Sequence, residues 1–443
     1  MRARVDRRTF MKATTGAAAA SLSFPHIVRS ANKKKLRAAV IGVGGRAVWN
    51  IPMMKDEAVV ALCDVDSRAL SKAAKLYPGA KTYRDYREMF EHSDDFDAVI
   101  VSTPDHHHYA ASIRAIRAGK AVYCEKPLTW SVWESLQLAA EAEKHKVPTQ
   151  MGNQGMGGHG WRIAYDYVKA GAIGDVKEVH SWTGSHGAWF SDGIRTPEGE
   201  DPVPEWLDWD LWLGAAPMRP FKGPQVYHPY RWRGWIDFGN GCLGDWSCHL
   251  TNAYYKILEP GFPVSVECLS QTGPAIDSYP KGKTVKWEFA ADGDRPAFDS
   301  YWYDGSHKPP RMPGIEEGRE VKGDGSYLVG TKGTCWIAGA HNNSALLVPE
   351  VRRKEFGKPK ALAPVSRGHR QEFVMAAKGE IPYDAPLSHF GYAGKLTAVN
   401  LMGNIAARVK GKLLYDAETQ RFSNSDEANA LLTRKPREGW YVS

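Results

Sequence analysis

Apolar runs alternate with segments of helical periodicity between residues 36 and 145. Short apolar runs predict strands at residues 36–43, 59–65, 98–102 and 121–124. Apolar side chains that recur at helical spacing predict helices at residues 67–76, 107–118 and 130–145. Strands separated by helices favour a parallel sheet with helices on both faces. We therefore predict a doubly wound α/β domain over residues 34–152.

The second part of the chain, residues 153–443, has a different pattern. Strand-like runs separated by glycine-rich turns occur at residues 264–270, 284–290, 326–329 and 334–337. Helical periodicity returns at residues 369–378 and near residues 391–408. A chain of 443 residues is too long for one ordinary hydrophobic core. We therefore expect a second, α+β domain here.

The first predicted strand ends in a glycine-rich turn, Gly42-Val43-Gly44-Gly45-Arg46-Ala47. This GxGxxA spacing is a form of the Rossmann dinucleotide-binding fingerprint. Gly42 permits the tight turn, and Gly44 lets the backbone approach a pyrophosphate at the N-terminus of the next helix. Gly45 and Arg46 are further candidates for phosphate contact, although Arg46 fits a solvated helix start equally well.

Asp64 stands 22 residues after Gly42, at the end of the second predicted strand. A carboxylate there accepts hydrogen bonds from the adenosine ribose and repels a 2′-phosphate, which favours NAD over NADP. The alternative is that Asp64 only caps the next helix, but Asp66 is better placed for that role. We therefore expect NAD as the cofactor.

Two further strand ends carry candidate cofactor contacts. They are Thr103, Pro104 and His108 in the segment TPDHHH (103–108), and Glu125 and Lys126 in the triplet EKP (125–127). Ligands of open α/β sheets bind at the carboxyl ends of strands, so both segments belong on the cofactor side. Three histidines could suggest a metal, but consecutive side chains diverge, and the six cysteines form no CxxC pair. No metal site is expected.

The positive charge of the chain is concentrated near its start. The net charge is +8, and residues 1–35 carry nine basic side chains against one acidic side chain, Asp6. A basic face for nucleic acid on the folded domains is therefore not expected. The run RRTFMK (7–12), followed by an alanine-rich apolar stretch, is typical of a twin-arginine export signal. A frayed amphipathic helix is the alternative.

We expect residues 1–33 to be this signal with a linker, the protein to be periplasmic, and the twin-arginine translocase to be its partner during export. No later apolar stretch reaches about 18 residues, so no stable membrane span is expected. Proteins exported by this route cross the membrane folded, and the periplasm has no dependable dinucleotide pool. The cofactor is therefore expected to leave the cytoplasm with the protein.

Together these motifs resemble the Gfo/Idh/MocA oxidoreductases, a family named for glucose–fructose oxidoreductase and inositol dehydrogenase. The resemblance runs from about Leu36 to the C-terminus. Its marks are GVGGRA (42–47), CDVD (63–66), STPDHHH (102–108), EKP (125–127) and GCLGDWSCH (241–249). It implies a second domain built on a large, mostly antiparallel sheet whose open face holds the substrate against the nicotinamide. We also expect a sheet-mediated homo-oligomer, a dimer or a tetramer.

The resemblance further implies a catalytic set of Lys126, Asp245 and His249. Oxidation of a secondary alcohol removes a hydride from carbon and a proton from oxygen. His249 suits the role of proton acceptor, and Lys126 can stabilise alkoxide-like charge on the oxygen. Asp245 precedes His249 by four residues, so both project from one face of a helix. Asp245 then binds a substrate hydroxyl or orients the imidazole.

Structural alternatives exist for these three residues: a surface lysine, a helical ion pair, or half of a metal site. The family pattern continues with a small residue, often glycine, inside the Asp/His pair and an acidic residue after it. Here Ser247 and Asn252 occupy those places. Asn252 weakens any inference of a further carboxylate and leaves the lysine and the Asp/His pair untouched.

The substrate is expected to contact aromatic and basic side chains ahead of this pair. The segment from Tyr227 to Trp235 is dense in groups that stack on a sugar ring or hydrogen-bond to it. Its candidate sugar contacts are His228, Arg231 and Trp232. Asn153 and Gln154 are candidates for the nicotinamide end, and His159 and Trp161 are candidates for the substrate pocket.

The leading hypothesis is an NAD-dependent oxidoreductase that acts on a secondary hydroxyl of a sugar or glycoside, with a tightly held cofactor that is recycled in place. A redox-neutral glycosidase is a related alternative: transient ring oxidation acidifies the adjacent C–H, the glycosidic bond eliminates, and the ring is reduced again. Lys126 favours plain oxidoreduction, because such glycosidases replace this lysine. A non-catalytic carbohydrate-binding or NAD-sensing protein is an alternative of another class, and the intact catalytic set argues against it.

Overall fold

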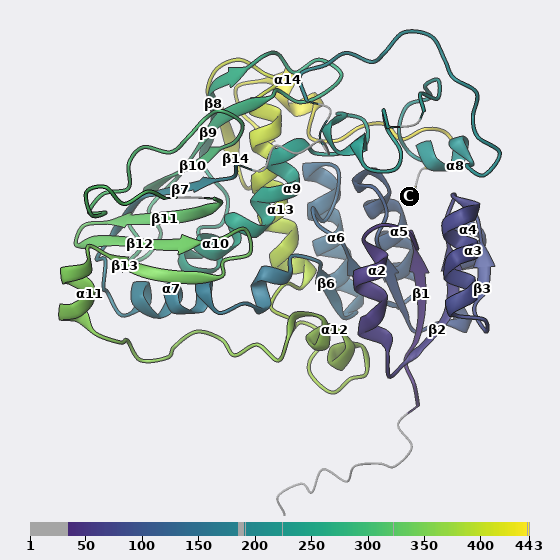
Figure 1. Ribbon diagram of the computed structural model, residues 1–443, viewed down its shortest axis with the longest axis horizontal. Helices are drawn as coiled ribbons and strands as arrows, with labels where there is room; N and C mark the ends of the chain where they lie inside the picture. Colours follow the sequence, from purple (N-terminus) through teal and green to yellow (C-terminus); the bar gives the residue numbers. More distant parts are fainter. Residues whose placement is uncertain are drawn as a thin grey trace, which may run out of the picture. The chain divides into compact units, whose positions relative to one another are not determined.

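A six-stranded parallel sheet forms the first part of the fold, in the strand order β3-β2-β1-β4-β5-β6. Figure 1 labels β1, β2, β3 and β6 of this sheet and the helices α2 to α6 around it. The computed structural model of the chain describes residues 34–184, 190, 192–223, 225–321, 323–440 and 442, so the predicted export signal lies outside the described residues. The strands are β1 (Arg37–Ile41), β2 (Ala58–Cys63), β3 (Lys81–Tyr83), β4 (Ala98–Val101), β5 (Ala121–Cys124) and β6 (Thr149–Met151). Strand β1 pairs with both β2 and β4, so the chain order reverses there. The predicted doubly wound domain is confirmed.

Helices connect these strands. They are α2 (Ala47–Asn50), α3 (Ser67–Leu76), α4 (Tyr86–Glu91), α5 (Asp105–Arg117) and α6 (Val132–His145), with the 3₁₀ turns η1 (Ile51–Met54) and η2 (Ser93–Asp95). Asp66 caps α3, because its side chain accepts hydrogen bonds from the backbone N–H groups of Arg68 and Ala69. Ser131 and Glu134 form a capping box at the start of α6. These caps position the helix starts at the carboxyl edge of the sheet.

A nine-stranded sheet forms the second part, in the order β13-β12-β11-β7-β10-β9-β8-β14-β15. Its strands are β7 (Val176–Trp182), β8 (Ser265–Thr272), β9 (Gly282–Phe289), β10 (Phe298–Tyr303), β11 (Gly325–Gly330), β12 (Gly333–Ala338), β13 (Ser344–Val348), β14 (Leu413–Asp416) and β15 (Arg421–Phe422). Strands β7 and β10 are parallel, and the other paired strands are antiparallel. The mostly antiparallel second sheet is therefore confirmed.

The remaining helical elements accompany this sheet or link it to the first. They are η3 (Gln154–Gly157), α7 (Gly160–Lys169), α8 (Trp209–Leu213), η4 (Arg231–Gly234), α9 (Gly241–Leu250), α10 (Asn252–Leu258), α11 (Glu350–Phe356), α12 (His369–Ala377), α13 (Phe390–Ala406) and α14 (Asp426–Ala430). None of the helices in the described ranges combines the length and the apolar character that crossing a bilayer requires.

Helix α13 connects the two sheets through one hydrophobic core. Trp287 of β9 donates from its indole to the carbonyl of Val399 in α13 at 2.9 Å. On its other side α13 crosses α6 so closely that a Cβ on Gly394 would lie 2.6 Å from the Ser135 carbonyl oxygen. Only glycine permits this approach. A single buried cluster contains side chains from both sheets.

Strand β6 ends at Met151, next to the position predicted from the sequence for the domain boundary, between residues 152 and 153. Helix α12, however, returns to the first sheet from the second part of the sequence. Its Phe373 and Val374 pack in one cluster with Val40 and Ile100 of that sheet. The two predicted domains therefore share packing on both sides of the boundary, and Leu36–Ser443 forms one compact unit.

Candidate active site

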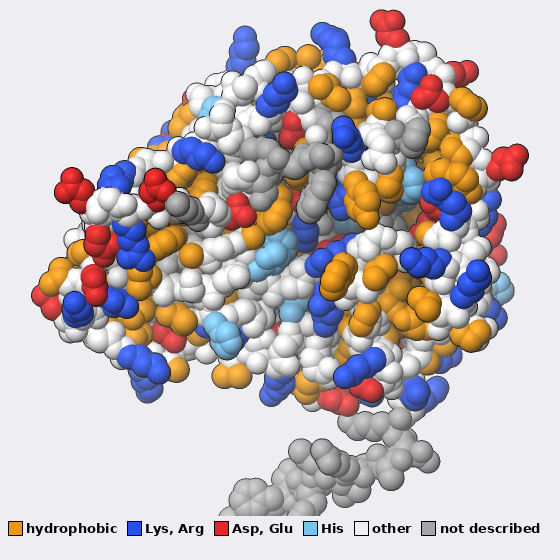
Figure 2. Space-filling view, viewed as in Figure 1, with side chains coloured by type: hydrophobic (Ala, Val, Ile, Leu, Met, Phe, Trp, Pro, Cys, Tyr) orange, Lys and Arg blue, Asp and Glu red, His pale blue; other side chains and the backbone are white. Residues whose placement is uncertain are grey.

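A cavity of about 660 Å³ extends along the carboxyl edge of the parallel sheet. Its walls include residues that directly follow β1, β2, β4 and β5, together with residues of α9 from the second domain. Figure 2 shows the hollow in this face of the molecule, where histidine, basic and acidic side chains gather. The cavity lies at the point of strand reversal, where open α/β sheets bind their ligands, and its volume is typical of a ligand site.

The glycine-rich turn forms the middle of this cavity. Gly42 has φ +77°, and a Cβ on it would lie 2.9 Å from the Ser102 backbone, so only glycine fits. Gly45, with φ +47°, has open space where its Cβ would be. Gly44 and Arg46 also line the cavity. The turn thus leaves room for a phosphate group at the N-terminus of α2.

The Asp64 carboxylate accepts hydrogen bonds from the backbone of this turn. Its Oδ2 accepts hydrogen bonds from the backbone N–H groups of Val43 at 2.9 Å and Gly44 at 3.3 Å. Its Oδ1 accepts from the Asp66 N–H at 2.9 Å. Burial raises the pKa of Asp64, and the three N–H groups oppose that shift. Asp64 lines the cavity beyond the glycine turn, where an adenosine ribose would lie.

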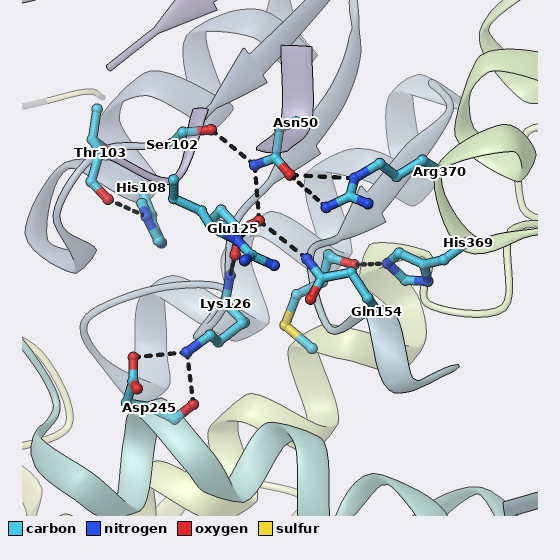
Figure 3. Close-up of polar contacts among 12 residues, drawn as sticks. Asn50, Ser102, Thr103, His108, Glu125, Lys126, Gln154, Asp245, His369 and Arg370 are labelled. Atoms are coloured by element: carbon cyan, nitrogen blue, oxygen red, sulfur yellow. Dashed lines mark hydrogen bonds and ion pairs between the residues drawn. The ribbon is translucent and has the colours of Figure 1, made fainter. Parts of the chain in front are cut away.

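Glu125 is the centre of a buried polar network on the opposite side of the turn (Figure 3). Its Oε1 accepts hydrogen bonds from Asn50 at 2.8 Å, Arg46 at 3.2 Å and Gln154 at 3.3 Å. A Cβ on Gly152 would lie 2.7 Å from this carboxylate, so the glycine makes space for it. The network fixes the strand end that carries Lys126.

Lys126 forms a buried ion pair with Asp245 of α9 (Figure 3). Its Nζ donates to Asp245 Oδ1 at 2.8 Å and to the Asp245 carbonyl oxygen at 3.0 Å. Burial disfavours both charges, but each charge stabilises the other, so the pKa of Lys126 is raised and that of Asp245 is lowered. Arg233, with its Nε 3.7 Å from the same carboxylate oxygen, further lowers the pKa of Asp245 and opposes the rise of the Lys126 pKa. Lys126 is therefore a fixed cation at the cavity wall.

His249 lies one helical turn after Asp245 and is 3% exposed at the same end of the cavity. Burial lowers its pKa well below 6.5, and the charge of Lys126 and the neighbouring His341 lower it further. The two imidazole rings are 4.6 Å apart. Asp245 bonds to Lys126 rather than to His249, so of its two expected roles it does not orient the imidazole. His249 is a neutral base at pH 7.

Several polar atoms of the cavity wall have no protein partner. The buried Thr103 Oγ1, His249 Nδ1 and Trp246 Nε1 make no hydrogen bond. Buried polar atoms without partners are rare, and at a cavity they indicate where a ligand binds. The glycine turn, Asp64, Thr103 and Glu125 together fit an extended dinucleotide, with the nicotinamide towards Lys126.

Three of the predicted cofactor contacts, His108, Asn153 and Gln154, lie outside the cavity wall. His108 is buried with both ring nitrogens facing carbonyls, of Pro127 at 2.8 Å and Thr103 at 3.0 Å. Asn153 donates to the Cys248 carbonyl and to Asn252, so it links the end of β6 to α9 and α10 instead of lining the cavity. Gln154 reaches the site only through Glu125. Pro104 does line the cavity.

Of the five candidate substrate contacts, only His228 and Trp232 line the cavity. Trp161 is fully buried and donates to the Met156 carbonyl at 2.8 Å, and His159 is exposed and outside the cavity. Arg231 is also outside the cavity wall, and Arg233 takes its place. Trp232 lines the cavity, with the Arg233 guanidinium 4.3 Å from its ring.

His228 lies at the end of the cavity away from Lys126, at a distance from the group expected to act on the sugar. Its Nε2 is 3.3 Å from Asp66 Oδ2, just after β2. Three strand spacings, roughly 14 Å, separate β2 from β5 and Lys126. The position of His228 depends on how a long connection folds back over the first domain, which its local sequence does not reveal.

The site residues that were not singled out from the sequence include Asn50, Arg233, His341 and Trp440. Arg233 lies in the same aromatic and basic segment as Arg231, which was predicted to contact the sugar, so the sequence contained a signal for Arg233. The other three carry no local motif and reach the site through tertiary packing. Among the described residues, no group of three or more His, Cys, Asp or Glu side chains is arranged to hold a metal ion.

A Rossmann sheet, a cavity along its carboxyl edge and a lysine–aspartate–histidine group at one end of that cavity fit an NAD-binding protein of an oxidoreductase family. The chain belongs to the Gfo/Idh/MocA family. Residues 36–153 match the family model described as "Oxidoreductase family, NAD-binding Rossmann fold". Residues 168–294 match the model described as "Oxidoreductase family, C-terminal alpha/beta domain". The N-terminal domain is thus an NAD-binding domain.

Curated relatives are similar over part of the chain. A glycosyl hydrolase family 109 protein of Stenotrophomonas maltophilia is 37% identical over 135 residues, which are 27% of this chain and 29% of that protein. Inositol 2-dehydrogenase 3 of Saccharopolyspora erythraea is 36% identical over 124 residues, 28% of this chain and 36% of that protein. The chain thus spans about a third of the length of these curated relatives.

Solved structures share the fold over most of the chain. The WlbA dehydrogenase from Bordetella pertussis, in complex with NADH and UDP-GlcNAcA, has a TM-score of 0.58 at 15% identity, covering 86% of this chain and 99% of that one. The aldose-aldose oxidoreductase from Caulobacter crescentus, complexed with glycerol, has a TM-score of 0.56 at 17% identity, covering 86% and 100%. At these identities the likeness establishes the fold alone.

Proposed function

We propose that this oxidoreductase removes hydride from a secondary hydroxyl-bearing carbon of a sugar or glycoside. The observation that carries the proposal is the Lys126–Asp245 ion pair beside neutral His249, at the nicotinamide end of the cavity. Bound NAD supplies the hydride acceptor. The chain's own residues must then bind the hydroxyl, orient it and take its proton.

Lys126 and His249 divide this work. Lys126 keeps its proton through the reaction, because the adjacent Asp245 carboxylate raises its pKa. Its N–H groups can hydrogen-bond the reacting oxygen and stabilise negative charge there. His249 is neutral and has a ring nitrogen without a partner, so it can accept the hydroxyl proton.

The cavity wall near these residues suits a polyhydroxylated ring. Trp246 has an unpartnered indole N–H, and its ring centroid lies 6.0 Å from Lys126 Nζ. Arg233 and Trp232 form a neighbouring stacked pair. Aromatic faces with nearby hydrogen-bond donors are typical of sugar sites. Relatives named as inositol dehydrogenases and the fold of an aldose-aldose oxidoreductase support this substrate class.

A redox-neutral glycosidase is the second candidate, and the similarity to a glycosyl hydrolase family 109 protein favours considering it. In that reaction the oxidised ring loses its glycosidic bond by elimination and is then reduced again. Lys126 at the reacting end supports simple oxidoreduction instead. The two are distinguished by incubating the purified protein with nitrophenyl glycosides and analysing the products. Released nitrophenol identifies the glycosidase, whereas an intact ketoglycoside identifies the dehydrogenase.

The proposal extends to where the protein works. If residues 1–33 direct export through the twin-arginine translocase, the enzyme acts in the periplasm with the NAD that it carries. A second sugar would then re-oxidise or re-reduce this NAD in place. Expression in cells with and without the translocase, followed by fractionation, tests the export. Light scattering of the purified protein tests the expected dimer or tetramer.

A further inference from the structure

Two segments that are distant in the sequence cover the β2–β3 end of the cavity. We call residues 206–214 with 226–238 the insertion, and residues 434–440 the C-terminal strap. We infer that the insertion and the strap together enclose the adenosine half of NAD, with Trp440 as a wall of the adenine site, so that NAD stays bound between turnovers. The inference rests on the NAD site described above and is independent of the substrate.

The sheet order identifies this end as the adenosine end. Lys126 follows β5 and lies near His249, so the nicotinamide end is towards β5. Asp64 follows β2, and Arg84, Asp85 and Tyr86 follow β3, on the far side of the glycine turn. All four line the same cavity. A dinucleotide whose pyrophosphate lies at the glycine turn therefore has its adenine next to Tyr86.

The insertion is attached to the loop between β2 and α3. Its Trp206 carbonyl accepts a hydrogen bond from the Ser67 N–H at 2.9 Å, and its Asp208 N–H donates to the Val65 carbonyl at 3.1 Å. The Arg68 guanidinium lies 3.2 Å from the centroid of the Trp206 ring. These contacts join the second domain to the residues directly after Asp64.

His228 of the insertion adds a side-chain contact at the same place. Its Nε2 lies 3.3 Å from Asp66 Oδ2, and both residues line the cavity. His228, Pro229 and Tyr230 therefore form the wall that faces the loop after β2. The insertion closes the adenosine end from the side of the second domain.

The C-terminal strap closes the adenosine end of the cavity on the side of β3. Trp440 is 4% exposed and lines the cavity, with its ring 5.7 Å from both Tyr86 and His107. The Arg87 guanidinium lies 4.2 Å from the indole centroid, and Arg87 Nη1 donates to the Gly439 carbonyl at 3.2 Å. These aromatic rings provide flat apolar surfaces of the kind that stack on a purine base.

Arg437 connects the strap to the insertion. Its Nε donates to the Gly214 carbonyl at 3.0 Å, and its Nη2 donates to the Asp210 carbonyl at 2.8 Å. The backbone N–H of Arg437 donates to the Ala215 carbonyl at 3.2 Å. Release of the adenosine half therefore requires that the strap and the insertion separate from each other and from the first domain. Coupled contacts of this kind slow dissociation more than association.

The test measures NAD retention in the full chain, purified without added cofactor and dialysed extensively. We expect the wild-type protein to retain close to one NAD per chain, determined after denaturation. Trp440→Ala should lose most of it, and its NAD release rate, followed by displacement with excess labelled NAD, should rise at least tenfold. Trp133→Ala is the matched control, because Trp133 is 40% exposed on α6 and outside the cavity wall; it should retain NAD as the wild type does.

Arg437→Ala gives a second test that leaves the cavity wall intact, because Arg437 does not line it. It should accelerate NAD release even if Trp440→Ala fails to fold. Wild-type protein that loses NAD on dialysis overturns the inference, as does a folded Arg437→Ala protein with the wild-type release rate. Neither result depends on sugar oxidation. A protein that oxidises a sugar with freely exchanging NAD would retain the proposed function and lose this inference.

Discussion

Lys126 Nζ lies 2.8 Å from Asp245 Oδ1, and this contact joins the end of β5 to helix α9 across the two domains. In the proposed reaction, it places a cation where the substrate oxygen would develop charge. Because the pair is buried, removing either partner leaves the other charge uncompensated. Loss of this pair is therefore expected to affect the proposed reaction.

Replacement of Lys126 by methionine removes the cation and keeps a side chain of similar length. We expect kcat for sugar oxidation to fall by about 10²–10³-fold, the usual effect of losing one charge-stabilising donor. NAD binding should change little, because the adenosine and pyrophosphate contacts remain. Lys75→Met, on the exposed surface of α3, is the matched control. Unchanged turnover in Lys126→Met would contradict the assigned role of Lys126. Absence of turnover in the wild-type protein would instead favour a non-catalytic binding protein.

The pH dependence of the reaction should report the lowered pKa of His249. A general base must be unprotonated, so kcat/KM should stay constant as the pH falls through 6.5 and decrease only below it. His249→Gln should lose about 10²–10⁴-fold in rate together with this acidic limb. The control His159→Gln, at an exposed residue outside the cavity, should keep the profile. An acidic limb centred above pH 7 would be inconsistent with a buried neutral base.

Asp64→Ser should weaken discrimination between NAD and NADP. The change removes a carboxylate that would repel a 2′-phosphate and hydrogen-bond the ribose. We expect the Kd for NAD to rise about tenfold and the ratio of the two Kd values to move towards one. Fluorescence titration of protein stripped of its cofactor measures both constants. Asp94→Ser, at an exposed position, is the control. If Asp64→Ser binds NAD and NADP with the wild-type Kd values, the role of Asp64 is only to hold the glycine turn in place.

Acid should destabilise the fold through its buried histidines. Burial lowers the pKa of His369 to about 4, whereas an unfolded histidine has a pKa of about 6.5. The unfolded chain therefore binds more protons between pH 6.5 and 4, and stability falls as the pH decreases through this window. The loss from this residue alone is about 3 kcal/mol when the pH reaches the lower value.

His369→Gln tests this assignment, because a glutamine amide can still donate to the Met151 carbonyl that His369 Nε2 contacts at 2.8 Å. Urea unfolding midpoints measured from pH 7 to pH 4 should show a shallower pH dependence in this variant, by about one proton. His159→Gln should leave the dependence unchanged. If His369→Gln and the wild type show the same pH dependence of the unfolding midpoint, His369 has the same protonation in the folded and the unfolded chain.

The sequence pattern predicted the first domain well because its strands and helices have apolar runs and caps that can be recognised in the local sequence. Residues 67–76 and 121–124 form α3 and β5 with the predicted bounds, and Asp66 caps α3 as expected. By contrast, β3 is a three-residue strand, KTY, at the edge of the sheet, and its partly exposed side chains give no apolar run. Strand β10 was missed because its sequence, FDSYWY, mixes aromatic and polar residues over six positions.

The same distinction applies to the site. Residues at strand ends, such as Gly42, Asp64 and Lys126, could be predicted because the carboxyl ends of parallel strands share one edge. His228 and Trp440 reach the cavity only through the insertion and the strap, whose paths are set by long-range packing. Their local sequence contains no sign of the strand end that they contact.

The most direct test of the proposed function follows hydride from sugar to cofactor. The purified protein, with its bound NAD, is incubated with perdeuterated sugars and polyols, quenched with acid-free denaturant, and the released dinucleotide is analysed by mass spectrometry. We predict that at least one sugar yields reduced dinucleotide carrying one deuterium, and that Lys126→Met acquires this label at least about 100-fold more slowly. NAD-loaded wild-type protein that acquires no deuterium from any sugar in the panel would contradict the account.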